Sequence, residues 1–176
     1  MARNSPSFLI TGPHKAGKST LCLDILNHVQ TRELSTGGVI TLQNNVRWFY
    51  LIQSKKKVLF EARNHESSVS IGKFRISEEN LQLALQHIAQ GLDCEYLFID
   101  EIGILEMSGK GYFPVLETAL TRPQGNIIVI RESIFDNFLS EFSLKFDYEV
   151  LRCSFGKNKS LLNQVKRKID KNFQEK

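Results

Sequence analysis

Residues 7–20 read SFLITGPHKAGKST, an apolar run that leads directly into the pattern Gly12-x-x-x-x-Gly17-Lys18-Ser19. The apolar run predicts a buried β-strand, and the amphipathic stretch that follows the pattern predicts a helix. A strand, a glycine-containing loop and a helix in this order form the context in which such a loop binds phosphates. The stretch therefore predicts an α/β domain with a phosphate-binding loop (P-loop) between its first strand and first helix.

Each residue type in the P-loop has a chemical reason. Gly12 and Gly17 let the backbone curl so that its N–H groups point toward an anion. Lys18 supplies positive charge for the β- and γ-phosphates, and Ser19 offers a hydroxyl to Mg²⁺. The nucleotide-binding residues that we predict are Gly12, Pro13, His14, Lys15, Ala16, Gly17, Lys18, Ser19 and Thr20.

A pair of acids follows a second apolar run, at residues 96–99. The run predicts a buried parallel strand, whose carboxyl end would carry Asp100 and Glu101 to the ligand-binding edge beside the P-loop. We expect Asp100 to hold Mg²⁺ together with Ser19, and Glu101 to orient or deprotonate the attacking water. The other interpretation is that the two acids are polar residues that simply end a strand.

An arginine often stabilises the charge that develops on the transferred phosphoryl group. Arg131 directly follows the apolar run 127–130, so it is expected at the same edge and completes a predicted catalytic set of Glu101, Lys18 and Arg131. A solvated arginine, or one paired with an acid such as Glu132, is the alternative. Arg63 and Arg75 are the fallback candidates for this role.

Composition bounds the class of protein. The 176 residues are 41% hydrophobic with a net charge of +4, which suits a single globular domain over residues 1–176. The positive charges are scattered on expected solvated faces, so nucleic acid is not an expected partner. Three widely spaced cysteines predict free thiols, and no apolar stretch is long enough for a signal peptide or a membrane span. We therefore expect a cytoplasmic protein with no membrane partner, and a monomer because no long exposed apolar stripe in the sequence calls for a dimer.

The expected elements alternate between strand and helix, apart from an antiparallel β-meander at residues 38–61 whose first turn is a two-residue turn at Asn44-Asn45. Alternation of this kind predicts a mostly parallel sheet covered by helices on both faces. Residues 62–76 lack periodicity, and either a plain surface connection or a lid over the nucleotide fits them. After the meander we expect helices at residues 77–91, 113–121, 132–141 and 158–171 and strands at 95–99, 126–130 and 148–151; the helix before it is expected at 20–34.

Three strings carry a family resemblance: Asp100-Glu101-Ile102-Gly103 with the later Glu106, Gly38-Val39-Ile40-Thr41, and Ile71-Gly72-Lys73-Phe74. With the P-loop, they are similar to the P-loop nucleoside-triphosphatase family of the thermophilic and cancer-related type. The resemblance implies a three-layer RecA-like fold and Mg²⁺-dependent hydrolysis of ATP, GTP and other nucleoside triphosphates to the diphosphate and phosphate. It leaves Glu106 with either a helix-capping or a catalytic role.

The chain departs from the family pattern at three places. Ile104 replaces a lysine, Leu42-Gln43 replace acids after Thr41, and His14-Lys15 form the tip of the P-loop. Two other functions stay open: a P-loop nucleotide or small-molecule kinase, and a non-catalytic nucleotide-binding regulatory module. Glu101, placed directly after Asp100, disfavours the non-catalytic module, and the sequence shows no cluster of arginines of the kind that small-molecule kinases use for a second substrate.

Overall fold

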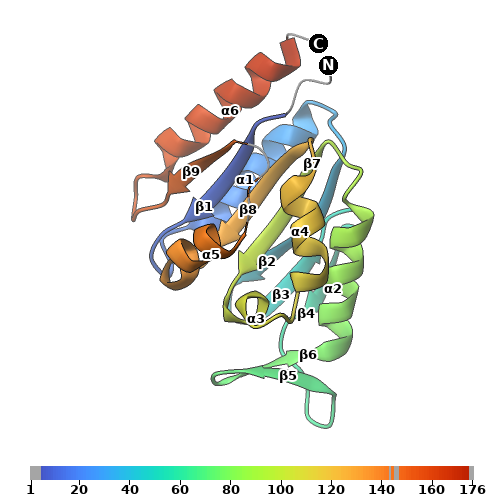
Figure 1. Cartoon of the computed structure of the whole chain (residues 1–176). Helices are drawn as coiled ribbons and strands as arrows, with labels where there is room; N and C mark the ends of the chain where they lie inside the picture. The colour runs from blue at the N-terminus through green and yellow to red at the C-terminus, as the bar shows by residue number, and fades with distance from the viewer. Residues whose placement is uncertain (1–4, 143, 145–146, 175–176) are drawn as a thin grey trace.

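The computed structural model describes residues 5–142, 144 and 147–174, and Figure 1 shows their arrangement. The strands are β1 (Ser7–Thr11), β2 (Thr36–Gln43), β3 (Arg47–Leu51), β4 (Lys56–Leu59), β5 (Ser68–Ile71), β6 (Phe74–Ser77), β7 (Tyr96–Ile102), β8 (Gly125–Ile130) and β9 (Tyr148–Arg152). The helices are α1 (Lys18–Thr31), α2 (Glu78–Gln90), α3 (Ile104–Met107), α4 (Phe113–Thr121), α5 (Phe135–Glu141) and α6 (Asn158–Gln174), with a short 3₁₀ helix, η1 (Glu132–Ile134).

Seven strands form one mixed sheet in the order β4-β3-β2-β7-β8-β1-β9. The five strands from β2 to β9 in this order pair in parallel, whereas β3 and β4 add to the β2 edge in antiparallel fashion. The expected parallel sheet with an inserted antiparallel meander is therefore confirmed. β8 lies between β1, which leads into the P-loop, and β7, which carries the two acids.

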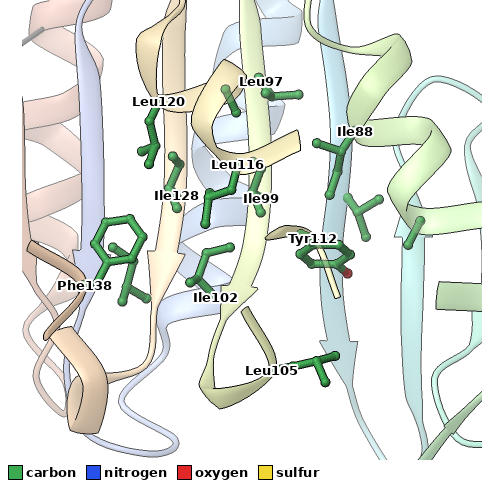
Figure 2. Packing of buried hydrophobic residues seen from close by; sticks show 14 of the residues in the cluster. Ile88, Leu97, Ile99, Ile102, Leu105, Tyr112, Leu116, Leu120, Ile128 and Phe138 are labelled. Atoms are coloured by element: carbon green, nitrogen blue, oxygen red, sulfur yellow. The ribbon is translucent and has the colours of Figure 1, made fainter. Parts of the chain in front are cut away.

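Side chains alternate across the sheet, so each inner strand feeds two cores. Leu9 of β1 and Ile128 of β8 belong to the core formed with α2, α4 and α5, part of which is drawn in Figure 2. Phe8 and Ile127, one position earlier in each strand, belong to the core formed with α1 and α6. Helices thus cover both faces of the sheet, which gives the predicted three layers.

Residues 62–76 were expected to lack regular structure, but β5 and most of β6 lie within them. β5 and β6 pair as an antiparallel hairpin, and Gly72 at its turn has φ +56°. Ile76 is buried, and Val69 and Ile71 pack against the same core. Figure 1 shows the hairpin projecting past the ends of the main strands. The lid interpretation of residues 62–76 stays a prediction.

Several element boundaries also differ from the prediction. Gln43 pairs with Arg47, so the first meander turn has three residues, and the Asn44 side chain accepts a hydrogen bond from the Val46 N–H. The expected helix 132–141 divides into η1 and α5, and the short α3 was not predicted. β7 continues to Ile102, which places both acids inside the strand rather than after it.

The last helix, α6, runs to Gln174, three residues past its expected end. It is fastened to α1 by Asp170, whose carboxylate accepts hydrogen bonds from Arg32 and pairs with His28. The Arg32 guanidinium is the main reason that the pKa of Asp170 lies below its usual value. Within the described residues, none of the helices, α6 included, has the length and apolar character that crossing a membrane requires.

Candidate active site

The loop between β1 and α1 has the backbone shape that its glycines predict. Gly12 and Gly17 have φ values of +141° and +86°, in the region that favours glycine. A Cβ atom at Gly12 would lie 2.4 Å from the Cys153 carbonyl oxygen, so a side chain there would displace the backbone that follows β9. Glycine at position 12 therefore allows the loop and the end of β9 to lie against each other.

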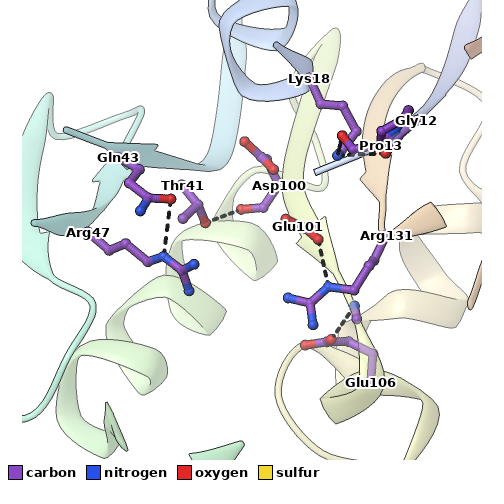
Figure 3. Close-up of polar contacts among 11 residues, drawn as sticks. Gly12, Pro13, Lys18, Thr41, Gln43, Arg47, Asp100, Glu101, Glu106 and Arg131 are labelled. Atoms are coloured by element: carbon purple, nitrogen blue, oxygen red, sulfur yellow. Dashed lines mark hydrogen bonds and ion pairs between the residues drawn. The ribbon is translucent and has the colours of Figure 1, made fainter. Parts of the chain in front are cut away.

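Lys18 is the first residue of α1, and its ammonium folds back over the loop (Figure 3). Its Nζ donates hydrogen bonds to the carbonyl oxygens of Gly12 at 2.8 Å and Pro13 at 2.9 Å. The start of a helix also carries partial positive charge from its unpaired N–H groups. The loop thus brings the ammonium and the helix N-terminus together at one place suited to an anion.

Asp100 and Glu101 are consecutive residues of β7, and in a regular strand they would point to opposite faces of the sheet. The pairing of β7 with β8 is irregular between Asp100 and Ile102, and a bulge of this kind redirects side chains. Asp100 faces Ser19 and Lys18, which act on its charge, whereas Glu101 faces Arg131. The irregularity lets both acids serve the same edge of the sheet.

Asp100 is completely buried, and no hydrogen bond of good geometry from the described residues reaches either carboxylate oxygen. Burial, followed by the charge of Glu101, raises the pKa of Asp100 to about 7. The Ser19 hydroxyl, the backbone of Thr41 and the Lys18 ammonium lower it, so all three lie near the carboxylate. A buried carboxylate with unengaged oxygens beside a hydroxyl is a donor set suited to a hard divalent cation.

Arg131 lies where the sequence placed it, directly after β8. Its Nε donates a hydrogen bond to Glu101 Oε1 at 2.9 Å, with both side chains partly exposed (Figure 3). The alternative interpretation, an arginine paired with an acid, is thus correct in kind, but the acid is Glu101 rather than Glu132. The pair joins two of the predicted catalytic residues.

The fallback arginines are placed elsewhere. Arg75 lies on β6 and donates to the Ser68 hydroxyl and to the Glu66 carbonyl, so its contacts are within the hairpin region. Arg63 precedes the hairpin and is exposed. Neither residue is brought to the P-loop by a contact in the described part of the chain.

Comparison with known proteins agrees with this geometry. The model of the NTPase family matches residues 7–166, which include the P-loop, both acids and Arg131. The chain belongs to the NTPase family.

This NTPase-family chain is similar to curated and solved relatives. The nucleoside-triphosphatase THEP1 of Korarchaeum cryptofilum is 25% identical over 122 residues, a match that spans 65% of this chain and 63% of that protein. The crystal structure of THEP1 from Aquifex aeolicus has a TM-score of 0.69 at 16% identity, covering 90% of this chain and 96% of the other. The solution structure of a human cancer-related nucleoside triphosphatase has a TM-score of 0.65 at 17% identity, covering 97% and 98%. These two structures show that the fold is shared.

In this NTPase-family chain Glu106 accepts hydrogen bonds from backbone N–H groups on both sides of it in the sequence. Its side chain is buried, and its two carboxylate oxygens accept hydrogen bonds from the Gly103 N–H at 2.8 Å and the Tyr112 N–H at 3.1 Å. The first of these bonds caps the start of α3, as a glutamate at the third helical position often does. Burial raises the pKa of Glu106, and the two N–H groups oppose the shift. The contacts support a capping role over a catalytic one.

We expect Glu106→Ala to lower the free energy of unfolding by about 2–4 kcal/mol, because two buried N–H groups lose their acceptor. Glu106→Gln, which keeps one acceptor oxygen, is expected to lose less. Urea unfolding of the NTPase-family chain and its variants measures both effects. A Glu106→Gln variant of native stability whose kcat fell several hundredfold would contradict the capping role.

Two residues that hold the backbone around this site, Thr41 and Asn158, were not among the predicted site residues. The Thr41 hydroxyl donates to the Asp100 carbonyl oxygen at 2.6 Å, which fastens β2 to β7 beside the acids. Asn158 donates through Nδ2 to the Ala16 carbonyl and accepts through Oδ1 from the Ser154 N–H. Thr41 belongs to the Gly38–Thr41 string and Asn158 begins the expected last helix, but only contacts between distant parts of the chain reveal these roles.

Proposed function

We propose that this chain hydrolyses nucleoside 5′-triphosphates to the diphosphate and phosphate in a reaction that requires Mg²⁺. The main support is the convergence of the Lys18 ammonium, the Ser19 hydroxyl and the buried, unengaged Asp100 carboxylate at one end of the P-loop. The names of the relatives, nucleoside-triphosphatase and nucleoside triphosphatase, point to the same reaction.

In this proposal the P-loop, residues 12–20, binds the phosphate chain. Its N–H groups and the Lys18 ammonium offset the negative charge of the β- and γ-phosphates. Ser19 and Asp100 would hold Mg²⁺, which would neutralise charge on the phosphate oxygens. Because Asp100 is buried, a cation bound beside it would offset the cost of burying its charge more fully than the nearby Lys18 ammonium does alone.

Glu101 and Arg131 complete the proposed machinery. The Glu101 carboxylate accepts the water proton or orients the water for attack, and Arg131 holds that carboxylate through Nε. The charge of the Arg131 guanidinium also stabilises the negative charge that develops on the γ-phosphoryl oxygens. In this proposal Arg131 has two roles: it holds the Glu101 carboxylate through Nε and stabilises charge on the phosphoryl group through its guanidinium.

Phosphate release from a panel of nucleoside triphosphates, with Mg²⁺ and with excess EDTA, tests the proposal. We expect turnover of several nucleotides with Mg²⁺ and a fall to background in EDTA, because the triphosphate charge is then unbalanced. A protein that releases no phosphate from any nucleotide would overturn the proposal. Equal turnover in EDTA would overturn the metal requirement, and transfer of the label to an added acceptor instead of water would favour the kinase.

A further inference from the structure

We infer that Phe155 is the platform on which the base of the bound nucleotide stacks; the inference rests on the proposed function and extends it to the nucleoside. Phe155 lies in the turn between β9 and α6, and the residue is 65% exposed. Among the described residues, no other large hydrophobic residue is as exposed as Phe155. Unlike the exposed Phe173, Phe155 also lines a hollow beside the P-loop, so a bound nucleotide could cover its ring.

A hollow of about 380 Å³ lies between this turn and the P-loop. Its lining includes Ala16 and Thr20 of the loop region, Asp24 of α1, and Phe155 and Lys159 of the turn and α6. Sites for small ligands usually measure about 300–1,000 Å³, so this hollow suits one nucleoside. It is continuous with the P-loop because Ala16 and Gly17 line it as well.

The sheet order fixes the direction in which the phosphate chain runs. The acids stand on β7, two strands from β1 on one side, whereas the turn that carries Phe155 follows β9, the neighbour of β1 on the other side. The γ-phosphate belongs at the acids, because Asp100 and Glu101 serve the bond that breaks. The α-phosphate and the nucleoside therefore extend across the P-loop toward Thr20 and the hollow.

The turn is attached to the P-loop, so the ring is held in a fixed place. Asn158 bonds both the Ala16 carbonyl, at 2.6 Å, and the Ser154 N–H, at 3.1 Å. The Lys157 N–H donates to the Ser154 carbonyl and closes the turn around Phe155. These bonds engage the amide oxygen and nitrogen of Asn158, whereas the Phe155 ring faces the hollow and is available for stacking on the base.

Stacking on an aromatic ring accepts every base and favours those with more surface. We therefore expect Phe155→Ala to raise the KM for ATP and GTP by about 5- to 150-fold, and the KM for CTP and UTP by less. The kcat should stay within about twofold, because the ring lies on the side of the P-loop away from the acids. Phe155→Trp should keep the native KM.

Inorganic tripolyphosphate separates stacking from support of the P-loop. It carries the phosphates without a base, so its inhibition constant against ATP hydrolysis should be the same in native protein and in Phe155→Ala. Phe173→Ala, which removes another exposed phenyl ring near the far end of α6, is the matched control and should leave the KM unchanged.

Two results would overturn the inference. One is an unchanged KM for ATP in Phe155→Ala. The other is a loss of tripolyphosphate inhibition by the same factor as the rise in KM, which would show that the ring only supports the loop. In either case, Mg²⁺-dependent turnover by the native protein would leave the proposed hydrolysis standing, so the two proposals can fail separately.

Discussion

Replacing Glu101 by glutamine is expected to lower kcat for ATP hydrolysis by about 10²–10³-fold. Glutamine has the size of glutamate but does not accept a proton, so the attacking water loses its base. The variant also replaces the ion pair with Arg131 by a neutral contact. Steady-state phosphate release measures the loss, and calorimetry with a non-hydrolysable ATP analogue should show an affinity within about twofold of native.

Glu132→Gln is the matched control, because Glu132 is an exposed acid at the same edge of the sheet and follows Arg131 directly. It should keep native turnover. A double-mutant cycle with Arg131→Gln then divides the two roles of Arg131. If Arg131 acts on the phosphoryl group as well as on Glu101, its loss lowers kcat further in the Glu101→Gln background. Native activity in Glu101→Gln would remove Glu101 from the mechanism.

Lys18→Ala is expected to weaken binding of a non-hydrolysable ATP analogue by about 10- to 150-fold, the usual worth of a hydrogen bond to a charged group. The ammonium is the side-chain cation that the P-loop holds over its own carbonyls, at Gly12 and Pro13. Its removal takes a side-chain positive charge away from the bound phosphates, so the backbone N–H groups of the loop carry more of the binding. The kcat should also fall, because the same charge faces the γ-phosphate during transfer.

Because Lys18 also bonds the loop backbone, its loss has to be separated from unfolding. Thermal unfolding of Lys18→Ala without nucleotide gives the structural effect, and binding is then measured well below the melting temperature. Lys171→Ala, which removes an exposed lysine of α6, controls for the change in net charge. Native affinity of Lys18→Ala for the analogue would contradict the assignment of the P-loop.

The sequence could predict those parts of the candidate site whose pattern lies within one short stretch of the chain. The P-loop is one continuous string, and its strand, turn and helix can be recognised from residue order. Asp100 and Glu101 could be recognised in the same way, because a buried strand ending in acids is a local pattern. The three-layer fold followed from the alternation of elements, and it agrees with the solved relatives.

The parts that the sequence did not predict depend on contacts between distant residues. The β5–β6 hairpin was missed because its apolar positions are few and stand among Ser and Arg, so its burial comes from the core that it meets. The irregularity at Asp100 in β7 arises from pairing with β8, which local sequence does not encode. The pairing of Arg131 with Glu101 in particular was not predicted for the same reason, since Glu101 is thirty positions away in the chain.

β2 belongs to two structures at once, the parallel body of the sheet and the first arm of the meander. The Thr41 hydroxyl of β2 donates a hydrogen bond to the Asp100 carbonyl oxygen, so the position of Asp100 depends on the strand that begins the meander. Deleting residues 38–61 would therefore remove the hydrogen bond that Thr41 donates to Asp100. Lengthening the turn between β3 and β4 would leave that hydrogen bond in place.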